Sequence, residues 1–342
     1  RYMEFGTVET SDALGKTLAH KVRLRDGFLK KGHIVSDKDI ADLQAAGHRH
    51  VIALTLEQGD MNEDDAADKI AASVCGRNLY ASEAVTGRVN LHAKADGVIT
   101  LDVDAIHGLN GVSSTITIAT LPAFSRGSKG DLVATIKIIP FAVLERDVEA
   151  ATKEAASAIN LFPFRPMRTG LVQTITHDSD VKMLDKTTRI TGARLTSMGG
   201  AIAKSVTCSH KARAVADCIL DGLKSCDLII IFGISAVCDP RDVIPAAIQL
   251  AGGVVEQVGM PVDPGNLLVL GRIDQTPVLG APGCARSPKL NGFDWVLERI
   301  CAGIAVQAGD ITAMGVGGLL KEIETRPRPR LASDIKASEP DF

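Results

Sequence analysis

The stretch Leu228-Ile229-Ile230-Ile231-Phe232-Gly233-Ile234-Ser235-Ala236-Val237-Cys238-Asp239-Pro240-Arg241-Asp242-Val243 decides the fold of the second half of the chain. Its first five residues are apolar without alternation, as expected of a central parallel strand that helices cover on both faces. A glycine then ends the strand, and Asp242 stands where it can cap a helix that runs through Ile244, Ala247 and Ile248. The stretch therefore predicts the strand–loop–helix step of an α/β sheet, on which ligands bind beyond the carboxyl ends of the strands.

Strand and helix alternate in the same way on both sides of this stretch. Strands are expected at 170–175, 202–208, 254–258, 267–270 and 277–279, and helices at 180–198, 212–223 and 293–304. The helix at 212–223 has the clearest pattern, because its apolar residues recur at the spacing of one helical face. We expect residues 169–305 to form an α/β domain with three layers and a doubly wound, mostly parallel sheet.

The rest of the chain is predicted to be mixed α+β. Residues 3–75 read as Ala-rich helices around one strand, with a helix capped at Ser36 and ended by Gly47, a strand at 51–56 and a helix at 63–75. Residues 76–142 read as a small β-rich module with strands at 98–103, 114–121 and 131–139. The predicted order then continues with a connecting helix (144–159) and linker in 143–168, a C-terminal helix at 306–325 and a linker or tail at 326–342.

Composition excludes several classes of protein. The 342 residues are 45% hydrophobic and 23% charged, with a net charge of −3, so no broad basic field is available to hold nucleic acid. No apolar run reaches the roughly 18–20 residues that a membrane span needs. The seven cysteines stand singly without a CxxC pair, and no signal peptide precedes the fold, which favours a reduced, cytoplasmic protein.

Three small-residue loops follow or precede strands of the predicted sheet, at 233–242, 260–266 and 280–288. Free N–H groups at a helix start attract phosphate, hydroxyl and guanidinium groups add donors, and a carboxylate beside phosphates usually acts through Mg²⁺. Each loop can equally be an ordinary turn, with Asp242 only a helix cap. The candidate ligand-binding residues are Gly233, Ser235, Asp239, Pro264, Gly265, Asn266, Pro282, Gly283, Arg286 and Ser287, with Asp242 as the candidate catalytic and metal-binding residue.

These loops resemble the molybdopterin-binding family in its MoeA and MogA branches. Residues 230–233 with Ser235, followed by Pro240-Arg241-Asp242-Val243-Ile244-Pro245, are similar to that family's strand, glycine turn and Pro-Arg-Asp-Val helix start. Pro264-Gly265 is similar to its Pro-Gly-Lys turn, with Asn266 in the place of the lysine. Pro282-Gly283 with Ser287 is similar to its Pro-Gly-Asn-Pro-x-Ser turn. Ile234 and Ala236 stand where the family has glycines.

The beginning of the chain is similar to the MoeA branch. Residues 13–19 resemble its opening helix, and Lys31-Gly32 followed by 39–47 resembles a Lys-Gly run with an Asp-Ile and a closing glycine. The resemblance implies that longer proteins of this kind continue, after a linker like the Arg-Pro stretch at 326–330, into a nucleotidyltransferase domain. We therefore expect this chain to be the front part of such a protein.

The resemblance implies a function in molybdenum cofactor biosynthesis, with molybdopterin or its adenylated form as ligand and Mg²⁺ as metal. MogA-type domains adenylate molybdopterin with Mg-ATP, and MoeA-type proteins release the nucleotide as molybdate is inserted, so the resemblance implies a transferase. It places Asp242 at the metal-site aspartate, with Asp239 as the alternative because one extra residue precedes Pro240. It also implies a homo-oligomer, and a target molybdoenzyme as a further partner.

Two other functions stay open on the sequence. One keeps the ligand and makes the chain a non-catalytic carrier that presents the cofactor to a molybdoenzyme. The other is a nucleotide pyrophosphatase of the CinA type, which shares the domain fold. Outside the loops, His48 with His50, Cys208 with His210 and the acidic residues of 60–68 are better explained by structural roles than by a metal or a nucleophile.

Overall fold

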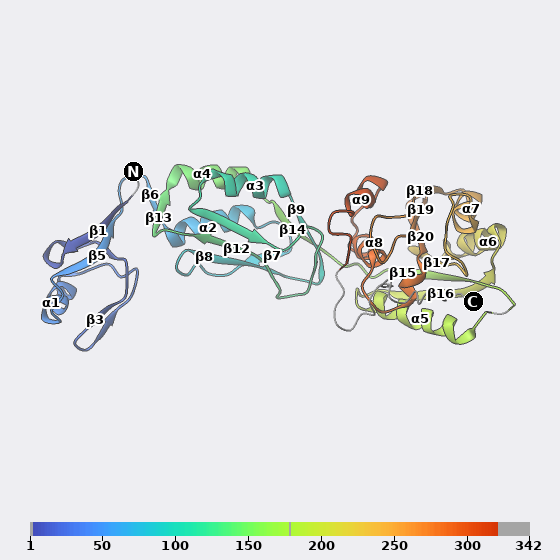
Figure 1. Ribbon diagram of the computed structural model, residues 1–342, viewed down its shortest axis with the longest axis horizontal. Helices are drawn as coiled ribbons and strands as arrows, with labels where there is room; N and C mark the ends of the chain where they lie inside the picture. The colour runs from blue at the N-terminus through green and yellow to red at the C-terminus, as the bar shows by residue number, and fades with distance from the viewer. Residues whose placement is uncertain (1–2, 178, 321–342) are drawn as a thin grey trace, which may run out of the picture. The chain divides into compact units, whose positions relative to one another are not determined.

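The computed structural model describes residues 3–177 and 179–320 of the chain. It divides into two compact units, with the boundary between Pro163 and Phe164. Figure 1 labels helices and strands of both units. Together they make a mixed α/β protein with one six-stranded, mostly parallel sheet and several small antiparallel sheets.

The first unit begins with a small antiparallel sheet of strand order β1-β5-β2. Its strands are β1 (Glu4–Glu9), β2 (Thr17–Leu18) and β5 (His50–Thr55), and a separate hairpin joins β3 (Val22–Leu24) to β4 (Gly27–Leu29). Helix α1 (Asp37–Ala45) packs its Leu43 into a cluster with Leu18, Val35 and Val51. The expected helix at 13–19 is wrong, because Thr17 and Leu18 pair instead with Leu54 and Ala53 of β5.

The predicted start and end of helix α1 are confirmed. Ser36 accepts a hydrogen bond from the backbone N–H of Asp39, while the Asp39 carboxylate accepts from the backbone N–H of Ser36, which is a reciprocal capping box. Gly47 follows the helix with φ of +88°, a conformation that glycine adopts without strain. The expectation of helices around a single strand is wrong for residues 3–75, however, because β1 and β2 pair with β5 and the hairpin strands β3 and β4 pair with each other.

The remainder of the first unit is built around one hydrophobic core. Its sheets have the orders β10-β12-β8-β7, β11-β9-β14 and β13-β6, and helices α2, α3 and α4 complete it. The elements are β6 (Asp60–Asn62), α2 (Glu63–Val74), β7 (Leu79–Ala81), β8 (Arg88–Ala93), β9 (Gly97–Leu101), α3 (Val103–Val112), β10 (Ile116–Thr120), β11 (Arg126–Gly127), β12 (Leu132–Ile138), β13 (Ala142–Leu144), α4 (Glu145–Glu154) and β14 (Ile159–Pro163).

Two details of this region differ from the sequence prediction. Helix α3 lies inside the segment expected to be β-rich, because Asp102 caps it through the N–H of Ala105 and Ile106 and Leu109 are buried. The helix expected at 144–159 ends at Glu154, and Ile159–Pro163 instead forms β14, which pairs antiparallel with β9. In both places tertiary pairing and burial outweigh local propensity.

The second unit contains the six-stranded sheet, of order β16-β15-β17-β20-β19-β18. Strands β16, β15, β17 and β20 are mutually parallel. Strand β19 is antiparallel to β20, and β18 is antiparallel to β19, so β18 has the same direction as the four parallel strands. The elements are β15 (Arg168–Ile175), α5 (Val181–Thr196), β16 (Ala201–Ser209), α6 (Ala212–Gly222), β17 (Leu228–Phe232), α7 (Val243–Leu250), β18 (Val254–Val258), β19 (Val269–Ile273), β20 (Thr276–Ala281), the short 3-10 helix η2 (Gly283–Arg286), α8 (Gly292–Cys301) and α9 (Ala308–Ala313).

Strand β17 is buried at every residue, as its unbroken apolar run predicts. Its alternate side chains Leu228, Ile230 and Phe232 pack in one hydrophobic cluster with residues of α5 and α8. Ile229 and Ile231 pack in a second cluster with residues of α6 and α7. The predicted strands and helices of 169–305 are present with shifts of a few residues at their ends, so the alternation of the sequence does set the order of elements here.

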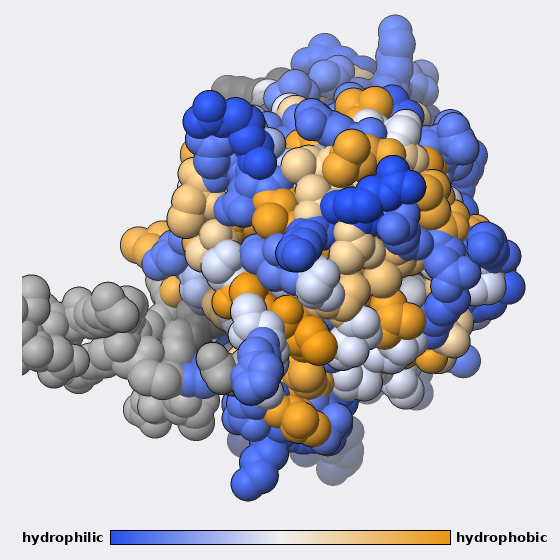
Figure 2. Space-filling view, turned by 90° about the vertical axis from the view of Figure 1, so that its right-hand side faces the viewer, coloured by the Kyte–Doolittle hydropathy of each residue, from blue (hydrophilic) through white to orange (hydrophobic). Residues whose placement is uncertain are grey.

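The surface of the second unit mixes the two kinds of side chain. Figure 2 shows hydrophilic and hydrophobic residues interspersed over the side on which Figure 1 draws α6 and α7. Leu220, Leu250 and Val254 are among its exposed hydrophobic residues. The helix expected at 306–325 is present only as α9, and residues 321–342, with the Arg-Pro stretch, lie outside the described residues. Among the described residues, no helix combines the length and the apolar character that a membrane crossing requires.

Candidate functional site

The structure places all three small-residue loops at one edge of the six-stranded sheet. The carboxyl ends of the four parallel strands lie at this edge, so the loops after β17 and β20 start there. Strand β19 is antiparallel to β20 and β18 is antiparallel to β19, so the loop from β18 to β19 also lies at this edge. The topology thus provides what a ligand site on such a sheet needs, which is loops from several strands at the same edge.

The first loop turns sharply at Gly233, immediately after β17. A Cβ atom at this position would lie 3.0 Å from the carbonyl oxygen of Ser235 and 3.6 Å from Cε1 of His210, so the turn is packed closely. The backbone N–H of Ile234 donates to Oγ1 of Thr174 over 2.9 Å. Ser235 is exposed, and so is Ile234, whose side chain stands where the family has a glycine.

The two aspartates of this loop have different partners. Asp242 is the N-cap of α7: its Oδ1 accepts from the N–H of Val243 over 2.7 Å, and its Oδ2 accepts from the N–H of Cys238 over 3.3 Å. Asp239 forms an ion pair with Arg241 through both carboxylate oxygens, and these hydrogen bonds lower the pKa of the Asp239 carboxyl. Asp242 is therefore the aspartate of this loop whose charge no arginine neutralises in the described structure.

The third loop brings Arg286 back over the end of β17. Its guanidinium donates to the carbonyl oxygen of Gly233 over 3.0 Å and to Oγ1 of Thr187 over 2.6 Å, with a longer contact of 3.4 Å to Oε1 of Gln173. It also lies over the ring of Phe232, 4.8 Å from the ring centre. Burial lowers the pKa of the Arg286 guanidinium. Among the described residues its partners are neutral oxygens and a ring, and no carboxylate is paired with it.

Arg194, on α5, is the counterpart that holds this loop in place. Its Nε donates to Oδ1 of Asp294 over 2.6 Å, and its terminal nitrogens donate to the carbonyl oxygens of Ala285 and Ser287. The Arg194 and Asp294 side chains are only 10% and 12% exposed, so this is a buried, fully paired cation. Arg194 was not among the predicted residues, and its position on a helix about 90 residues earlier gave no signal of the contact.

The remaining predicted residues of the third loop are Pro282, Gly283 and Ser287. Pro282 is buried, Gly283 is exposed and Ser287 is half-buried. A Cβ atom added at Gly283 would meet nothing within 4 Å. The protein itself therefore leaves open space against the backbone at Gly283, where a bound molecule can approach.

The second loop is fixed against the start of α8. The peptide bond before Pro264 is cis, and the carbonyl oxygen of Pro264 accepts from the N–H of Gly292 over 2.8 Å. Gly265 has φ of +139°, and a Cβ atom there would lie 2.6 Å from that same nitrogen. The Asn266 amide makes only a long contact, 3.5 Å, with the carbonyl oxygen of Met260. This loop shares the sheet edge with the other two, while its described hydrogen bonds to other elements are with the start of α8 and with Gly318 and Leu320 after α9.

Two further polar residues lie next to Gly233: Thr174, which the sequence did not indicate, and His210, to which the sequence analysis assigned a structural role together with Cys208. Thr174 is buried near the end of β15, and its Oγ1 lies 2.9 Å from Nδ1 of His210, which follows β16. Nε2 of His210 lies 3.4 Å from Oγ of Ser235. Burial, together with the neighbouring Cys218, raises the pKa of the Cys208 thiol to about 12, which agrees with a structural rather than a nucleophilic role for Cys208.

The donor set around the loops determines which metal ion can fit. Among the described residues, no three His, Cys, Asp or Glu side chains are grouped as a protein-only metal site requires. Mg²⁺ commonly takes one or two carboxylates and completes its shell with phosphate oxygens and water. Asp242 fits that pattern as a single carboxylate, so any Mg²⁺ here would depend on the ligand for most of its oxygens.

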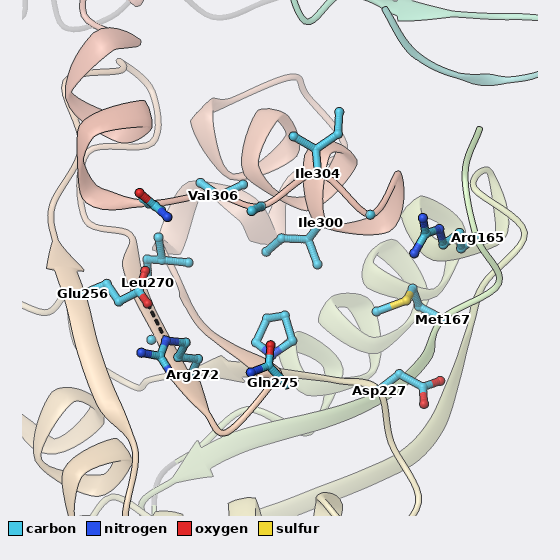
Figure 3. A pocket seen from close by; sticks show the side chains of 15 residues that line it. Arg165, Met167, Asp227, Glu256, Leu270, Arg272, Gln275, Ile300, Ile304 and Val306 are labelled. Atoms are coloured by element: carbon cyan, nitrogen blue, oxygen red, sulfur yellow. Dashed lines mark hydrogen bonds and ion pairs between the residues drawn. The ribbon is translucent and has the colours of Figure 1, made fainter. Parts of the chain in front are cut away.

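A cavity of about 540 Å³ lies at the opposite edge of the sheet (Figure 3). It is lined around Met167 and Asp227, which precede β15 and β17, and by Gly303–Gln307 after α8. Glu256 and Arg272 of its wall are paired with each other, and Asp227 is paired with Arg168. None of the predicted site residues is among those that line it, so the cavity and the predicted loops are separate features of the unit.

The comparisons with known proteins give the following similarities. Residues 7–55 match a family described as a domain of unknown function (DUF8806), and no curated protein matches the chain. The chain is similar to the solved molybdopterin biosynthesis MoeA protein from Pyrococcus horikosii, with a TM-score of 0.30 and 11% identity over 88% of this chain and 75% of that one. It is also similar to a molybdenum cofactor biosynthesis protein B, with a TM-score of 0.28 and 14% identity over 40% of this chain and 87% of that one. A molybdenum cofactor biosynthesis protein from Pyrococcus furiosus matches with a TM-score of 0.25 and 12% identity over 89% of this chain and 66% of that one. At these scores the likeness carries no argument about function, which must come from the site itself.

Proposed function

We propose that the second unit binds molybdopterin or its adenylated form at the carboxyl edge of its six-stranded sheet, as part of molybdenum cofactor biosynthesis. The main support for this proposal is the state of Arg286. The Arg286 guanidinium is half-buried, burial lowers its pKa, and its described partners are neutral oxygens. A desolvated charge is costly unless it is paired, so a cation in this state is suited to an anionic ligand.

The hydrogen-bonding capacity of Arg286 supports the same conclusion. A guanidinium has five N–H donors, and the three described acceptors of Arg286 leave some of them for a phosphate oxygen. The open backbone at Gly283 and the exposed hydroxyl of Ser235 add further donors or approach points at the same edge. The resemblance of these loops to the molybdopterin-binding family then suggests the ligand class. The packing of β17 into two clusters supports the three-layer arrangement of that family.

Asp242 and Mg²⁺ belong to the chemical part of the proposal. Asp242 is the residue that would hold Mg²⁺, and the ion would supply neutralisation of phosphate charge in phosphoryl transfer. Arg286 would bind the phosphate side of the ligand, and the Gly283 backbone would line it. Pro264, Asn266 and Ser287 would form the rest of the ligand surface, and the buried Gly265 and Pro282 would shape the loops that carry it. Asp239 is the less suited acid because Arg241 already pairs with it.

A non-catalytic carrier is the second candidate, and two positions favour it. The side chain of Ile234 is 39% exposed in the loop where phosphate would meet glycine backbone. Asn266 supplies no cation where the family has lysine. Both changes would weaken contacts to phosphate more than contacts to the pterin ring, so they would reduce catalysis more than binding.

The test is a calorimetric titration of molybdopterin into the full chain and into Arg286→Met. We expect the wild type to bind and Arg286→Met to bind at least about tenfold more weakly, since one charge-assisted hydrogen bond contributes that much. Arg213→Met, which changes an exposed arginine on α6, is the matched control and should bind normally. Failure of the wild type to bind, or equal binding by Arg286→Met, would overturn the proposal.

Incubation with substrates then separates the candidate activities. Adenylation of molybdopterin from Mg-ATP supports a transferase, and binding without turnover supports a carrier. Release of nucleoside monophosphate from ADP-ribose, without molybdopterin binding, supports the pyrophosphatase of the CinA type.

A further inference from the structure

His210 is placed at the proposed site by the order of the parallel strands. Strand β16 lies beside β15, and β15 lies beside β17. His210, Thr174 and Ser235 come at or just after the carboxyl ends of these three strands, so they form a row across the edge. Gly233 lies within this row: its carbonyl oxygen accepts from Arg286, while the place of its missing Cβ lies 3.6 Å from the His210 ring.

Thr174 determines how the His210 ring is oriented. Its buried Oγ1 already accepts from the N–H of Ile234 over 2.9 Å. The hydroxyl hydrogen then has two acceptors within reach, Nδ1 of His210 at 2.9 Å and the carbonyl oxygen of Phe232 at 3.5 Å. In the 2.9 Å contact the hydroxyl donates to Nδ1 in one tautomer of His210 and accepts from Nδ1–H in the other. A neutral imidazole whose Nδ1 accepts carries its proton on Nε2.

We propose that the Thr174 hydroxyl donates to Nδ1 of His210 and so acts as the positioning residue, and that the Nε2–H of His210 donates to a phosphate oxygen of the ligand together with the hydroxyl of Ser235. The inference rests on the proposed function for the identity of the ligand. The contact from Nε2 to Oγ of Ser235 is 3.4 Å, long for a hydrogen bond between these atoms, and Ser235 is exposed. An oxygen of a phosphate that bridges the two groups gains a donor from each of them.

The row explains why a histidine stands after β16. A histidine that served only to fill space would gain nothing from a fixed proton on its outward nitrogen. Here Nδ1 lies 2.9 Å from the Thr174 hydroxyl, and among the described residues the contact of Nε2 is the long one to an exposed hydroxyl. Arg286 and His210 both contact the turn at Gly233, so both can provide donors to an anion bound there.

The experiment uses the full chain and two probes, molybdopterin and inorganic phosphate. Nitrogen-15 NMR of the imidazole rings distinguishes the two tautomers. We expect His210 to carry its proton on Nε2, and we expect the Nε2 signal to shift when either probe binds. Thr174→Val should lose the tautomer preference. These measurements on the wild type do not depend on whether any variant of His210 folds.

Binding by variants provides the second readout. His210→Leu should weaken molybdopterin binding about tenfold or more, which is the effect of losing one hydrogen bond to a charged group. His210→Gln, whose side-chain amide nitrogen lies near the place of Nε2, should stay within about threefold of the wild type. His107→Leu makes the same change at an exposed histidine of α3 in the other unit and is the control.

The outcomes separate this inference from the proposed function. If molybdopterin binds the wild type and His210→Leu equally, or binds without moving the Nε2 signal, the role of His210 is wrong and the proposed function stands. If the wild type does not bind molybdopterin, the proposed function fails. The titration with inorganic phosphate then tests whether His210 belongs to a phosphate site. A phosphate-dependent shift at Nε2 then supports a phosphate site for another ligand, and no shift overturns it.

Discussion

The guanidinium of Arg286 donates to the carbonyl oxygen of Gly233 over 3.0 Å, and this hydrogen bond joins the loop after β20 to the loop after β17. The two residues are 53 positions apart in the chain. Since β17 and β20 are neighbours in the sheet, their carboxyl ends place these loops side by side. The contact leaves Arg286 with neutral partners, whereas Arg194, which holds the same loop, is paired with Asp294.

The two arginines should differ in their effect on stability. Arg194→Met leaves the Asp294 carboxylate buried without its partner and should lower the free energy of unfolding by about 3–5 kcal/mol. Arg286→Met leaves no unpaired carboxylate and removes hydrogen bonds to neutral oxygens, so it should lower the free energy of unfolding by less, about 1.5–2 kcal/mol. Urea unfolding of both variants measures the difference. Equal losses would show that Arg286 is a structural cation, and the proposed ligand site would lose its main support.

Asp242 can be tested as a metal ligand separately from its role as a helix cap. Asp242→Ala removes the cap of α7 and should lower the free energy of unfolding by about 1 kcal/mol. Asp242→Asn keeps one oxygen for the N–H of Val243 and loses only the longer contact to the N–H of Cys238, so it should be less destabilising than Asp242→Ala. Because it removes the negative charge, it should lose the effect of Mg²⁺ on ligand binding. Calorimetry of molybdopterin binding with and without Mg²⁺ checks this. Asp239→Asn is the comparison, and loss of the Mg²⁺ effect there instead would assign the metal to Asp239.

Gly283 and Gly265 should respond differently to the addition of a methyl group. A Cβ at Gly283 meets nothing within 4 Å, so Gly283→Ala should change the free energy of unfolding by less than about 0.5 kcal/mol while weakening molybdopterin binding. Gly265→Ala should be destabilising by more than about 1 kcal/mol, because φ is +139° and the Cβ would lie 2.6 Å from the nitrogen of Gly292. Thermal unfolding and titration of both variants measure these effects. Gly309→Ala, also in open space, is the control for binding.

The first unit should lose stability in acid through Asp39. Burial alone raises the pKa of this carboxyl, but hydrogen bonds from Ser36 and His33 outweigh burial and lower the pKa to about 2. A carboxyl whose folded pKa lies below its unfolded value of 3.8 stabilises the fold above that value, and the contribution disappears as pH falls from about 4 to about 2. We expect a loss of about 1–2 kcal/mol in urea unfolding over this range. Asp39→Asn should flatten the dependence, and Asp26→Asn, on the exposed turn between β3 and β4, should leave it intact.

Cys208 should be unreactive toward alkylating agents. Its thiol has a pKa of about 12, so almost none of it is thiolate at pH 8. Cys238 is exposed in the loop after β17 and should be modified first. Mass spectrometry after brief treatment with iodoacetamide shows the order. Early modification of Cys208 would contradict the structural role assigned to it.

The sequence alone determined the local parts of this protein. The unbroken apolar run 228–232 indicated a strand covered on both faces, and the apolar spacing of 212–223 indicated a helix, because both patterns depend on neighbours along the chain. The caps at Ser36 and Asp242 were also predicted, since a cap needs only its own side chain and the next few N–H groups. Helix α3 and strand β14 were missed because burial and pairing with distant strands decide them.

Only the tertiary structure decided the electrostatics of the site. The sequence named Arg286, but whether a carboxylate neutralises it depends on Thr187, Gln173 and Gly233, which belong to other elements of the unit. Thr174 and His210 lie 36 positions apart and gave no motif, and they come together because β15 and β16 are adjacent parallel strands. Strand order is set by packing of the whole sheet, so a pattern read along the chain predicts which loops exist but not which side chains meet between them.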